Sequence, residues 1–188
     1  MIRIERIINW RDPHYKYGEL VLKDSFPTNE YRDLTELRKY VNSNNLFHFN
    51  LILDDNTPIG IITYWLLDAC CYVEHFAIEQ SKRNSGYGEK VLSKLKQLVE
   101  ERIVLEVEMP EDEITKRRIK FYERAGFTLY DKPYFQPPYR KEDKPLPMLI
   151  MAYGKEISNK EFIDIRNIIY KEVYHYTLEN HKNRSGCL

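Results

Sequence analysis

The sequence has neither an excess of one charge nor a long hydrophobic run. It contains 29 basic and 29 acidic side chains in 188 residues, which gives a formal net charge of zero. Such a chain has no overall field to attract nucleic acid or an anionic membrane, although a local basic patch would still do so. No run of about 18 apolar residues could form a transmembrane helix, and the first ten residues do not have the pattern of a signal peptide. We therefore expect a cytoplasmic protein with no nucleic-acid partner and no membrane.

Cysteine is scarce as well. The chain has three cysteines, and two of them are adjacent, Cys70 and Cys71. This number and spacing fit neither a disulfide framework nor a zinc site. We expect a protein of the reducing cytosol in which the cysteines are structural and no metal is bound.

The rest of the composition is typical of one globular domain. Hydrophobic residues make up 43% of the chain and charged residues 31%, which is ordinary for a soluble protein. A chain of this length can bury a substantial core. The 15 tyrosines favour either an aromatic core or a pocket lined by aromatic side chains.

The first half of the chain alternates between strand and helix patterns. Apolar and charged residues alternate at the start and predict a first strand, and a helical pattern follows from Pro13 to about Asn42. Three β-rich segments come next, and their short polar separators favour an antiparallel meander. These segments cover residues 47–53, 58–67 and 71–79. The next helix has an apolar stripe that consists of Tyr87, Val91, Leu95 and Leu98.

A strand is predicted at residues 103–109 because its apolar and acidic residues alternate. Short connections on either side of the preceding helix predict that this strand lies parallel to the strand containing Phe76 and beside it, through a right-handed crossover. A further helix is predicted at 110–126. We expect its first turn to be acidic, with Glu111, Asp112 and Glu113, and Gly126 to close it as a left-handed cap.

The C-terminal third begins with a proline-rich stretch, residues 133–145, which we expect to be a loop, followed by a last strand. Ser158 and Glu161 then form a capping box that opens an amphipathic helix. Its apolar stripe consists of Phe162, Ile165, Ile169, Val173 and Tyr176. Such a stripe has to be covered, either by the sheet of the same chain or by a second subunit, so a homodimer is one of two arrangements. We expect a main domain at 1–154, this helix at 155–178 and a loose tail at 179–188.

A basic, glycine-containing turn stands directly before the helix that starts near residue 87. Glycines at 86 and 88 would let a ligand approach the backbone, and the first amides of the helix are donors without partners. Such a helix start can bind a phosphate group. A tight strand-to-helix turn explains the same glycines, and the residues of the turn leave both interpretations open.

The surrounding motifs decide in favour of a ligand site. The stretch "FAIEQSKRNSGYGEKVL" resembles the acyl-CoA-binding motif of the GNAT superfamily of N-acyltransferases, and "FYERAGF" resembles a second signature of that family. "LEVE" stands between them, where the family has its fifth strand. The resemblance spans about residues 1–154. It implies an α/β (α+β) fold with a mixed, mainly antiparallel central sheet flanked by helices, in which two neighbouring strands splay apart to bind acyl-CoA.

The resemblance also assigns roles to residues of this chain. The backbone of the splayed strand would pair with the pantetheine arm of acetyl-CoA, and the amides of the glycine turn would hold the pyrophosphate. Tyr122 matches the position from which family members donate a proton to the departing CoA thiolate. The implied residues for binding acetyl-CoA are Phe76, Ala77, Ile78, Arg83, Asn84, Ser85, Gly86, Tyr87, Gly88 and Phe121.

An amine acceptor is protonated near neutral pH, so a base has to take a proton before the amine attacks. Glu106 is the best candidate, because in "LEVE" it matches a glutamate that some family members use, and Glu74 is a second candidate. For Glu108 we expect an ion pair, and for His75 a buried histidine with satisfied hydrogen bonds.

The aromatic loop after residue 132 could select the acceptor, since loops on a rigid scaffold carry specificity. The alternative is a surface loop whose aromatic side chains cover the edge of the sheet. The candidate substrate-binding residues are Tyr134, Phe135, Gln136 and Tyr139. Together these features predict transfer of an acetyl group from acetyl-CoA, or of another acyl group from its acyl-CoA, to a primary amine by direct attack in a ternary complex. The expected partner is a small-molecule or peptide amine. The alternative is a GNAT-like domain that binds CoA or acyl-CoA as a sensor without turnover.

Overall fold

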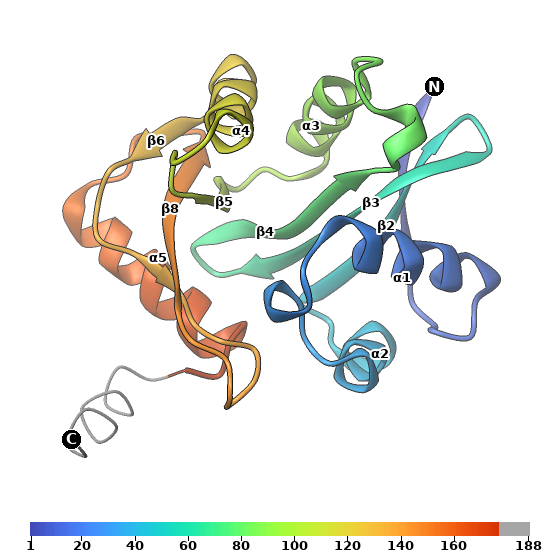
Figure 1. Cartoon of the computed structure of the whole chain (residues 1–188), viewed down its shortest axis with the longest axis horizontal. Coiled ribbons are helices and arrows are strands. Elements are labelled where there is room, and N and C mark those ends of the chain that lie inside the picture. Colours follow the sequence, from blue (N-terminus) through green and yellow to red (C-terminus); the bar gives the residue numbers. More distant parts are fainter. Residues whose placement is uncertain (177–188) are drawn as a thin grey trace.

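The computed structural model describes residues 1–176, and the predicted loose tail at 179–188 lies outside the described residues. The chain forms an eight-stranded mixed sheet flanked by helices (Figure 1). The strand order is β1-β2-β3-β4-β5-β8-β6, and β7 pairs with β8 off this path. The strands are β1 (Ile2–Ile7), β2 (Phe47–Asp54), β3 (Thr57–Leu67), β4 (Cys70–Ile78), β5 (Ile103–Glu108), β6 (Thr128–Tyr130), β7 (Phe135–Gln136) and β8 (Leu146–Tyr153). The α-helices are α1 (Pro13–Ser25), α2 (Leu34–Ser43), α3 (Tyr87–Leu98), α4 (Glu113–Arg124) and α5 (Asn159–Glu172). The predicted fold class is confirmed.

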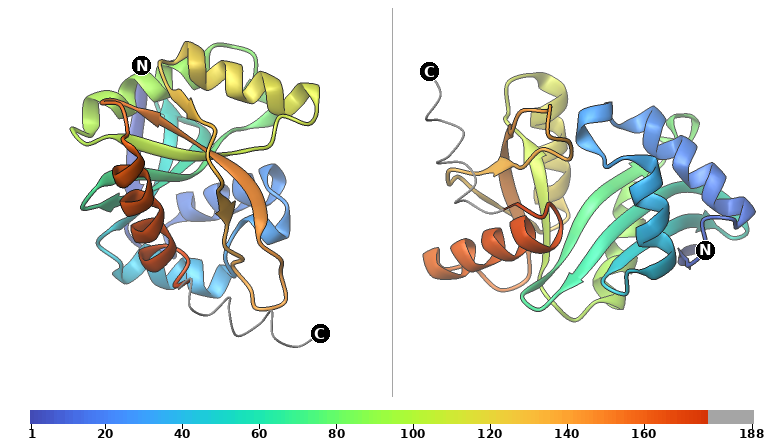
Figure 2. Two further views of the ribbon diagram at one scale, coloured as in Figure 1. Left: turned by 90° about the vertical axis from the view of Figure 1, so that its left-hand side faces the viewer. Right: turned by 90° about the horizontal axis from the view of Figure 1, so that it is seen from below.

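The helices divide between the two faces of the sheet. Helices α1, α2 and α5 lie on one face, and α3 and α4 lie on the other (Figures 1 and 2). Each face has its own hydrophobic cluster, since residues of α1, α2 and α5 share one cluster and residues of α3 and α4 share the second. The central strands are therefore buried on both sides. In the described residues no helix is long and apolar enough to cross a membrane.

The helix termini follow the local sequence. Ser158 accepts a hydrogen bond from the Glu161 amide and the Glu161 side chain accepts one in return, so the predicted capping box is confirmed. Gly126 has φ 82°, as expected for a left-handed helix cap. Asp112 is the N-cap of α4, and Glu113 lies in its first turn. Glu111 lies before the helix, which corrects the prediction of three acids in the first turn.

The helical region predicted between Pro13 and Asn42 is two helices. Residues 26–33 separate α1 from α2 and include one short 3-10 turn, because Pro27 disfavours helical backbone at the preceding residue. The stripe predicted for α3 was wrong at its end, since Leu98 is 49% exposed whereas Leu92 is buried. Leu98 is the last residue of α3, where the helix runs past the edge of the sheet.

The two neighbouring parallel strands, β4 and β5, are joined through α3, as predicted. Their pairing stops at Val73 and Leu105. The next residue of β4, Glu74, is an extra residue in the pairing with β3, because Thr63 pairs with His75 and the following residue of β3 pairs with Val73. Such a bulge bends its strand. Beyond Glu74 the strand β4 therefore diverges from β5, and a gap opens in the middle of the sheet.

The C-terminal helix α5 packs on the domain's own sheet. Its buried side chains belong to the cluster on the α1 and α2 face. These side chains are Phe162, Ile165, Ile169 and Tyr170, followed by Val173 just after the helix. The division of the chain into three segments and a second subunit stay predictions.

Candidate active site

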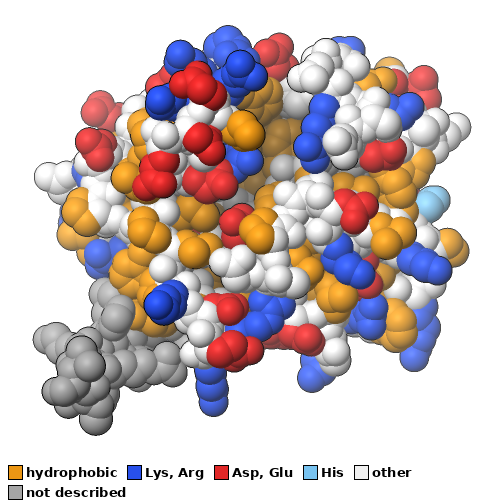
Figure 3. Space-filling view, in the orientation of Figure 1, with side chains coloured by type: hydrophobic (Ala, Val, Ile, Leu, Met, Phe, Trp, Pro, Cys, Tyr) orange, Lys and Arg blue, Asp and Glu red, His pale blue; other side chains and the backbone are white. Residues whose placement is uncertain are grey.

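A cavity occupies the gap between β4 and β5, with a volume of about 310 Å³. It extends between the two faces of the sheet, because it is lined by Phe26 at the end of α1 and by Phe121 and Tyr122 on α4. Figure 3 shows the surface hollowed between α4 and α3, with hydrophobic side chains at the floor and lysine or arginine on the rims. A long ligand could therefore enter from the α3 and α4 face while a second molecule enters from the other.

The predicted acyl-CoA-binding strand lines this cavity. Phe76, Ala77 and Ile78 all contribute to its wall. Arg83 also lines it, and its guanidinium donates to the carbonyl oxygen of Ile78 at 2.9 Å and to Ser25 Oγ at 3.4 Å. Arg83 therefore holds the turn against the end of the strand.

The turn before α3 presents backbone amides in the form of an anion-binding nest. Asn84 and Gly86 have positive φ, 62° and 74°, whereas Ser85 between them does not. Alternation of this kind turns successive N–H groups toward one side. Within the described part of the chain, the N–H groups of residues 84–88 donate to no protein oxygen. The positive end of the α3 dipole adds to this site, so the turn is suited to bind a phosphate group.

The two glycines of the turn are required for different reasons. A Cβ at Gly86 would meet no atom within 4 Å, so the positive φ is what requires glycine there. A Cβ at Gly88 would lie 2.9 Å from the ring of Phe121. Gly88 thus permits α3 to approach α4, and its role is packing within the protein. The Tyr87 side chain points elsewhere, since its hydroxyl donates to Asp54 at 2.9 Å.

Glu106 is held in the gap by tyrosines. The hydroxyls of Tyr134 and Tyr174 donate to its two carboxylate oxygens, the second at 3.0 Å. The Tyr174 hydroxyl is also 2.9 Å from that of Tyr72. Burial raises the pKa of Glu106 to about 7, although the tyrosine hydrogen bonds oppose the shift. In the described residues Glu106 forms no ion pair, so its carboxyl group can take up and release a proton near neutral pH.

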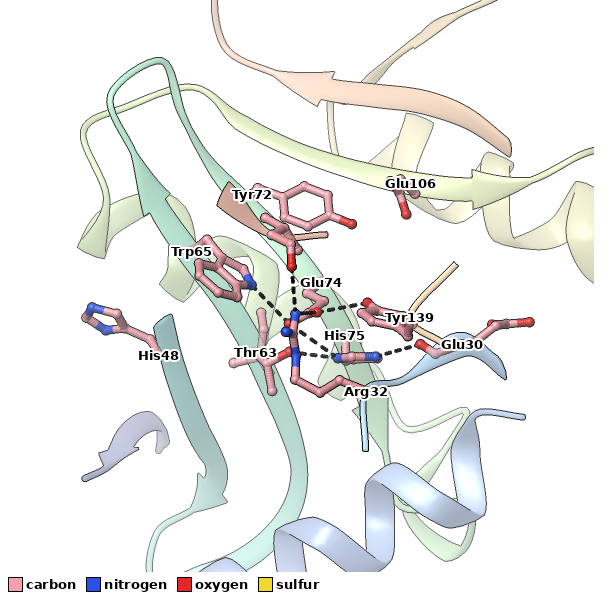
Figure 4. Close-up of polar contacts among 12 residues, drawn as sticks. Glu30, Arg32, His48, Thr63, Trp65, Tyr72, Glu74, His75, Glu106 and Tyr139 are labelled. Atoms are coloured by element: carbon pink, nitrogen blue, oxygen red, sulfur yellow. Dashed lines mark hydrogen bonds and ion pairs between the residues drawn. The ribbon is translucent and has the colours of Figure 1, made fainter. Parts of the chain in front are cut away.

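Glu74 lies in a different environment (Figure 4). Its carboxylate accepts hydrogen bonds from Arg32 at 2.5 Å, from Tyr139 at 2.8 Å and from Trp65 Nε1 at 3.0 Å. The side chains of Glu74 and Arg32 are 1% and 2% exposed. Burial raises the pKa of Glu74, but the attraction of Arg32, together with that of His75 and the hydrogen bonds from Arg32 and Trp65, outweighs it and the net pKa is lowered. A buried carboxylate with a lowered pKa is a weak base, which argues against Glu74 as the proton acceptor.

The remaining titratable groups that the sequence indicated are also engaged. His75 is buried, with Nδ1 3.0 Å from Thr63 Oγ1 and Nε2 3.0 Å from the carbonyl oxygen of Glu30, as expected for a histidine with satisfied hydrogen bonds. Glu108 forms an ion pair with Arg118 of α4, also as expected.

Tyr122 lines the cavity from α4, on the face opposite to Glu106. Its ring packs against Phe121 and Phe127, with centroid distances of 5.1 and 5.6 Å. Burial raises the pKa of Tyr122 to about 12, so its hydroxyl stays protonated at neutral pH. In the described residues no hydrogen bond of this hydroxyl is present, so it could donate one to a ligand.

The four candidate substrate residues separate into three groups. Gln136 lines the cavity. Tyr134 and Tyr139 bind the two buried glutamates with their hydroxyls. Phe135 faces the other way and packs against Tyr170 at 5.3 Å, because successive residues of a strand point to opposite sides. The predicted loop is thus partly the short strand β7.

Several residues of the site were not apparent from the sequence. Arg32 follows a loop and has no periodic pattern around it, and its role depends on contacts with residues more than 40 positions away. Tyr174 lies just after α5, where the predicted apolar stripe placed Tyr176 instead. Its spacing of four from Tyr170 would have been the available signal, since residues four apart lie on one face where a helical pattern continues.

No group of three or more metal-ligating side chains that could hold a metal ion is present among residues 1–176.

The model of the acetyltransferase (GNAT) family matches residues 4–127. No curated protein matches the chain significantly.

Solved structures resemble the chain at two levels. A GNAT-family protein from Bacteroides thetaiotaomicron, assigned to the acetyltransferases, aligns with a TM-score of 0.90 and 46% identity over 93% of this chain and 99% of its own. Arabidopsis thaliana NAA60 with a bisubstrate analogue aligns with a TM-score of 0.60 and 14% identity, over 81% of this chain and 97% of its own. An Elizabethkingia anophelis GNAT-family acetyltransferase with acetyl-CoA bound aligns with a TM-score of 0.54 and 13% identity, over 82% of this chain and 98% of its own. The last two show a shared fold alone. The family model and the B. thetaiotaomicron structure together show that this chain belongs to the GNAT family of acetyltransferases.

Proposed function

We propose that the protein transfers an acetyl group from acetyl-CoA to a primary amine by direct attack in a ternary complex. The observation that carries the proposal is Glu106, a buried carboxyl group with a pKa of about 7 in the gap between the splayed strands. Acetyl-CoA would supply the acetyl group as a thioester, and the transfer forms a C–N bond, breaks the C–S bond and releases CoA. Relatives of the same fold hold acetyl-CoA or a bisubstrate analogue, which supports this donor.

The residues present fit an acyl-CoA on the α3 and α4 face. The amides of residues 84–88 have no acceptor in the described chain, and the space beside Gly86 is open. These amides would bind the pyrophosphate. The free edge of β4 at residues 76–78 would pair with the amide groups of the pantetheine arm as an added strand would.

Glu106 would accept the proton that the amine loses. A carboxylate with a pKa near 7 is about half ionised at neutral pH, and it is a stronger base than an ordinary glutamate. Its attachment to Tyr134 and Tyr174 restrains its orientation. The ionised form would attract the incoming ammonium group, take one proton from it and leave the nitrogen lone pair free for attack.

Tyr122 would return a proton on the opposite side. Tyr122 lines the cavity, and its hydroxyl is protonated at neutral pH because burial raises its pKa to about 12. When the C–S bond breaks, the sulfur carries the electron pair and the tyrosine can donate its proton. After the attack the nitrogen carries a positive charge and loses its second proton to solvent, and the phenolate is reprotonated from solvent through the cavity.

Two measurements test this proposal. Acetyl-CoA at 100 times its dissociation constant should stabilise the fold by about 2.7 kcal/mol, which is measurable as a rise in Tm. A panel of primary amines should then release free CoA thiol in a spectrophotometric assay. Binding of acetyl-CoA without release of CoA thiol in the presence of any amine would favour the sensor function. A failure of acetyl-CoA to change the Tm would refute acetyl-CoA as the acetyl donor.

A further inference from the structure

Gln136 has a buried amide group without a hydrogen-bond partner. The residue is 5% exposed, and its Nε2 atom is buried without a hydrogen-bond acceptor. Leaving a buried donor unpaired is unfavourable. Because Gln136 lines the cavity of the proposed active site, a ligand in that cavity can supply the missing acceptor once the terminal amide rotates and turns Nε2 toward it.

The backbone around Gln136 is fixed, so the residue cannot easily move away from the cavity. Gln136 pairs with Leu146 of β8, and the hydroxyl of Tyr170 donates to the carbonyl oxygen of Phe135 at 2.6 Å. The two residues that follow are prolines, Pro137 and Pro138, which restrict the chain further. Gln136 is therefore held at the cavity wall by a rigid element rather than by a mobile loop.

The charges around the cavity favour a neutral partner for this amide. Glu74 is paired with Arg32, and Glu108 with Arg118. Glu30 and Glu106 also line the cavity, and neither forms an ion pair among the described residues. Arg83 lines it as well, but its guanidinium is directed to the Ile78 carbonyl oxygen and Ser25 Oγ at the turn before α3. A carboxylate bound at Gln136 would be repelled by them, whereas a carbonyl oxygen would accept the hydrogen bond without that penalty.

The positions in the sheet set a minimum length for the partner. Glu106 pairs with Ile150 of β8, and Gln136 pairs with Leu146 of the same strand. Four residues of a strand correspond to about 13 Å. Even with both side chains directed inward, an acceptor that reaches both groups has to be extended.

We propose that Gln136 determines acceptor specificity by hydrogen bonding a neutral carbonyl oxygen of an extended primary amine whose amino group lies at Glu106. This inference rests on the proposed function and names the acceptor class: amines with an uncharged amide group several bonds from the nitrogen. Both a small amino amide and the N-terminus of a peptide carry this chemistry.

The test compares two substrate series in the full-length protein. N-(ω-aminoalkyl)acetamides of increasing length carry the amide, and n-alkylamines of equal length lack it. The variant Gln136→Met keeps the size of the side chain and removes the donor, and Gln97→Met at an exposed position of α3 is the matched control. We expect Gln136→Met to lower kcat/KM about ten- to hundredfold for the longer acetamides, to leave the alkylamines unchanged, and to raise the Tm of the free protein by about 2–4 °C.

The outcomes separate the two hypotheses. Equal effects of Gln136→Met on both series, with turnover intact, would overturn this inference and leave the proposed function standing. Absence of turnover with every amine, although acetyl-CoA binds, would overturn both. A tetrapeptide with a free N-terminus distinguishes the sources: a higher kcat/KM than the best acetamide supports a peptide acceptor, and a lower one supports a small amino amide.

Discussion

Replacing Glu106 by glutamine is expected to lower turnover and, at the same time, to stabilise the protein at neutral and alkaline pH. The substitution keeps the shape of the side chain and removes its charge. Both tyrosine contacts can survive, because a hydroxyl group can accept a hydrogen bond as well as donate one. The change therefore isolates the cost of ionising a buried carboxyl group.

The sign and size of the effect follow from the pKa. Glu106 titrates at about 7 in the folded protein instead of 4.5. Between these values the folded protein keeps a proton that the unfolded chain has released, so the free energy of unfolding falls as the pH rises through this window. Each pKa unit corresponds to about 1.4 kcal/mol, which gives about 3 kcal/mol. A glutamine side chain does not ionise, so Glu106→Gln does not lose this free energy as the pH rises. The free energy of unfolding of the variant, relative to that of the wild type, should therefore increase by about that amount between pH 4.5 and pH 8.

The measurement is denaturant unfolding of wild type and variant at a series of pH values between 4.5 and 8. The exposed Glu100→Gln serves as the control, for which no such pH-dependent difference is expected. Turnover of Glu106→Gln should fall by about 10²- to 10⁴-fold, while acetyl-CoA still raises the Tm. A stability difference that does not change with pH would show that Glu106 ionises as an ordinary glutamate. Glu106 would then no longer be supported as the base.

Substitutions at Tyr122, at Gly86 and in the Arg32–Glu74 pair test other parts of the site. Tyr122→Phe should lower kcat and leave the Tm increase by acetyl-CoA intact, and an unchanged kcat would remove this hydroxyl from the mechanism. Gly86→Asn should retain acetyl-CoA binding because asparagine tolerates positive φ, whereas Gly86→Glu should abolish it by placing a carboxylate in the phosphate site; retained binding in the second variant would contradict that site. Arg32→Met should destabilise the fold by about 3–5 kcal/mol in thermal or denaturant unfolding, since it leaves a buried carboxylate unpaired. Adding Glu74→Gln should restore most of that loss, and an absence of restoration would show that the ion pair is not the cause.

Much of the fold could be predicted because its signals are local. Alternation and helical periodicity indicated the strands and most helices, and short connections indicated the parallel neighbours β4 and β5. The turn proposed to bind phosphate could be located for the same reason, since Arg83 to Gly88 form one continuous motif beside a helix start. The bulge at Glu74 was not predictable, because it depends on the pairing of β4 with β3 and has no signature within β4 itself.

The polar contacts of the site could not be predicted, because they join distant parts of the chain. Arg32 meets Glu74 across 42 positions, and Tyr174 meets Glu106 across 68. Composition indicated an abundance of tyrosine, but its position in the structure decides which hydroxyls reach a carboxylate. Gln136 was a candidate because it lies in an aromatic loop. Only the structure shows that its side-chain nitrogen has no hydrogen-bond partner.

The two buried glutamates show how the choice of partner determines chemical behaviour. Glu74 and Glu106 both lose solvent, and loss of solvent alone raises the pKa of a carboxyl group. Around Glu74 the charge of Arg32 and the surrounding hydrogen bonds together more than compensate for burial and lower its pKa, so this residue stays ionised and anchors the bulge that opens the gap. Glu106 receives only neutral tyrosine donors, which compensate for burial in part, and its pKa settles at about 7. Tyrosine thus supplies orientation without the positive charge that would keep the carboxylate ionised and weakly basic, which is the environment that the proposed role of Glu106 as a base requires.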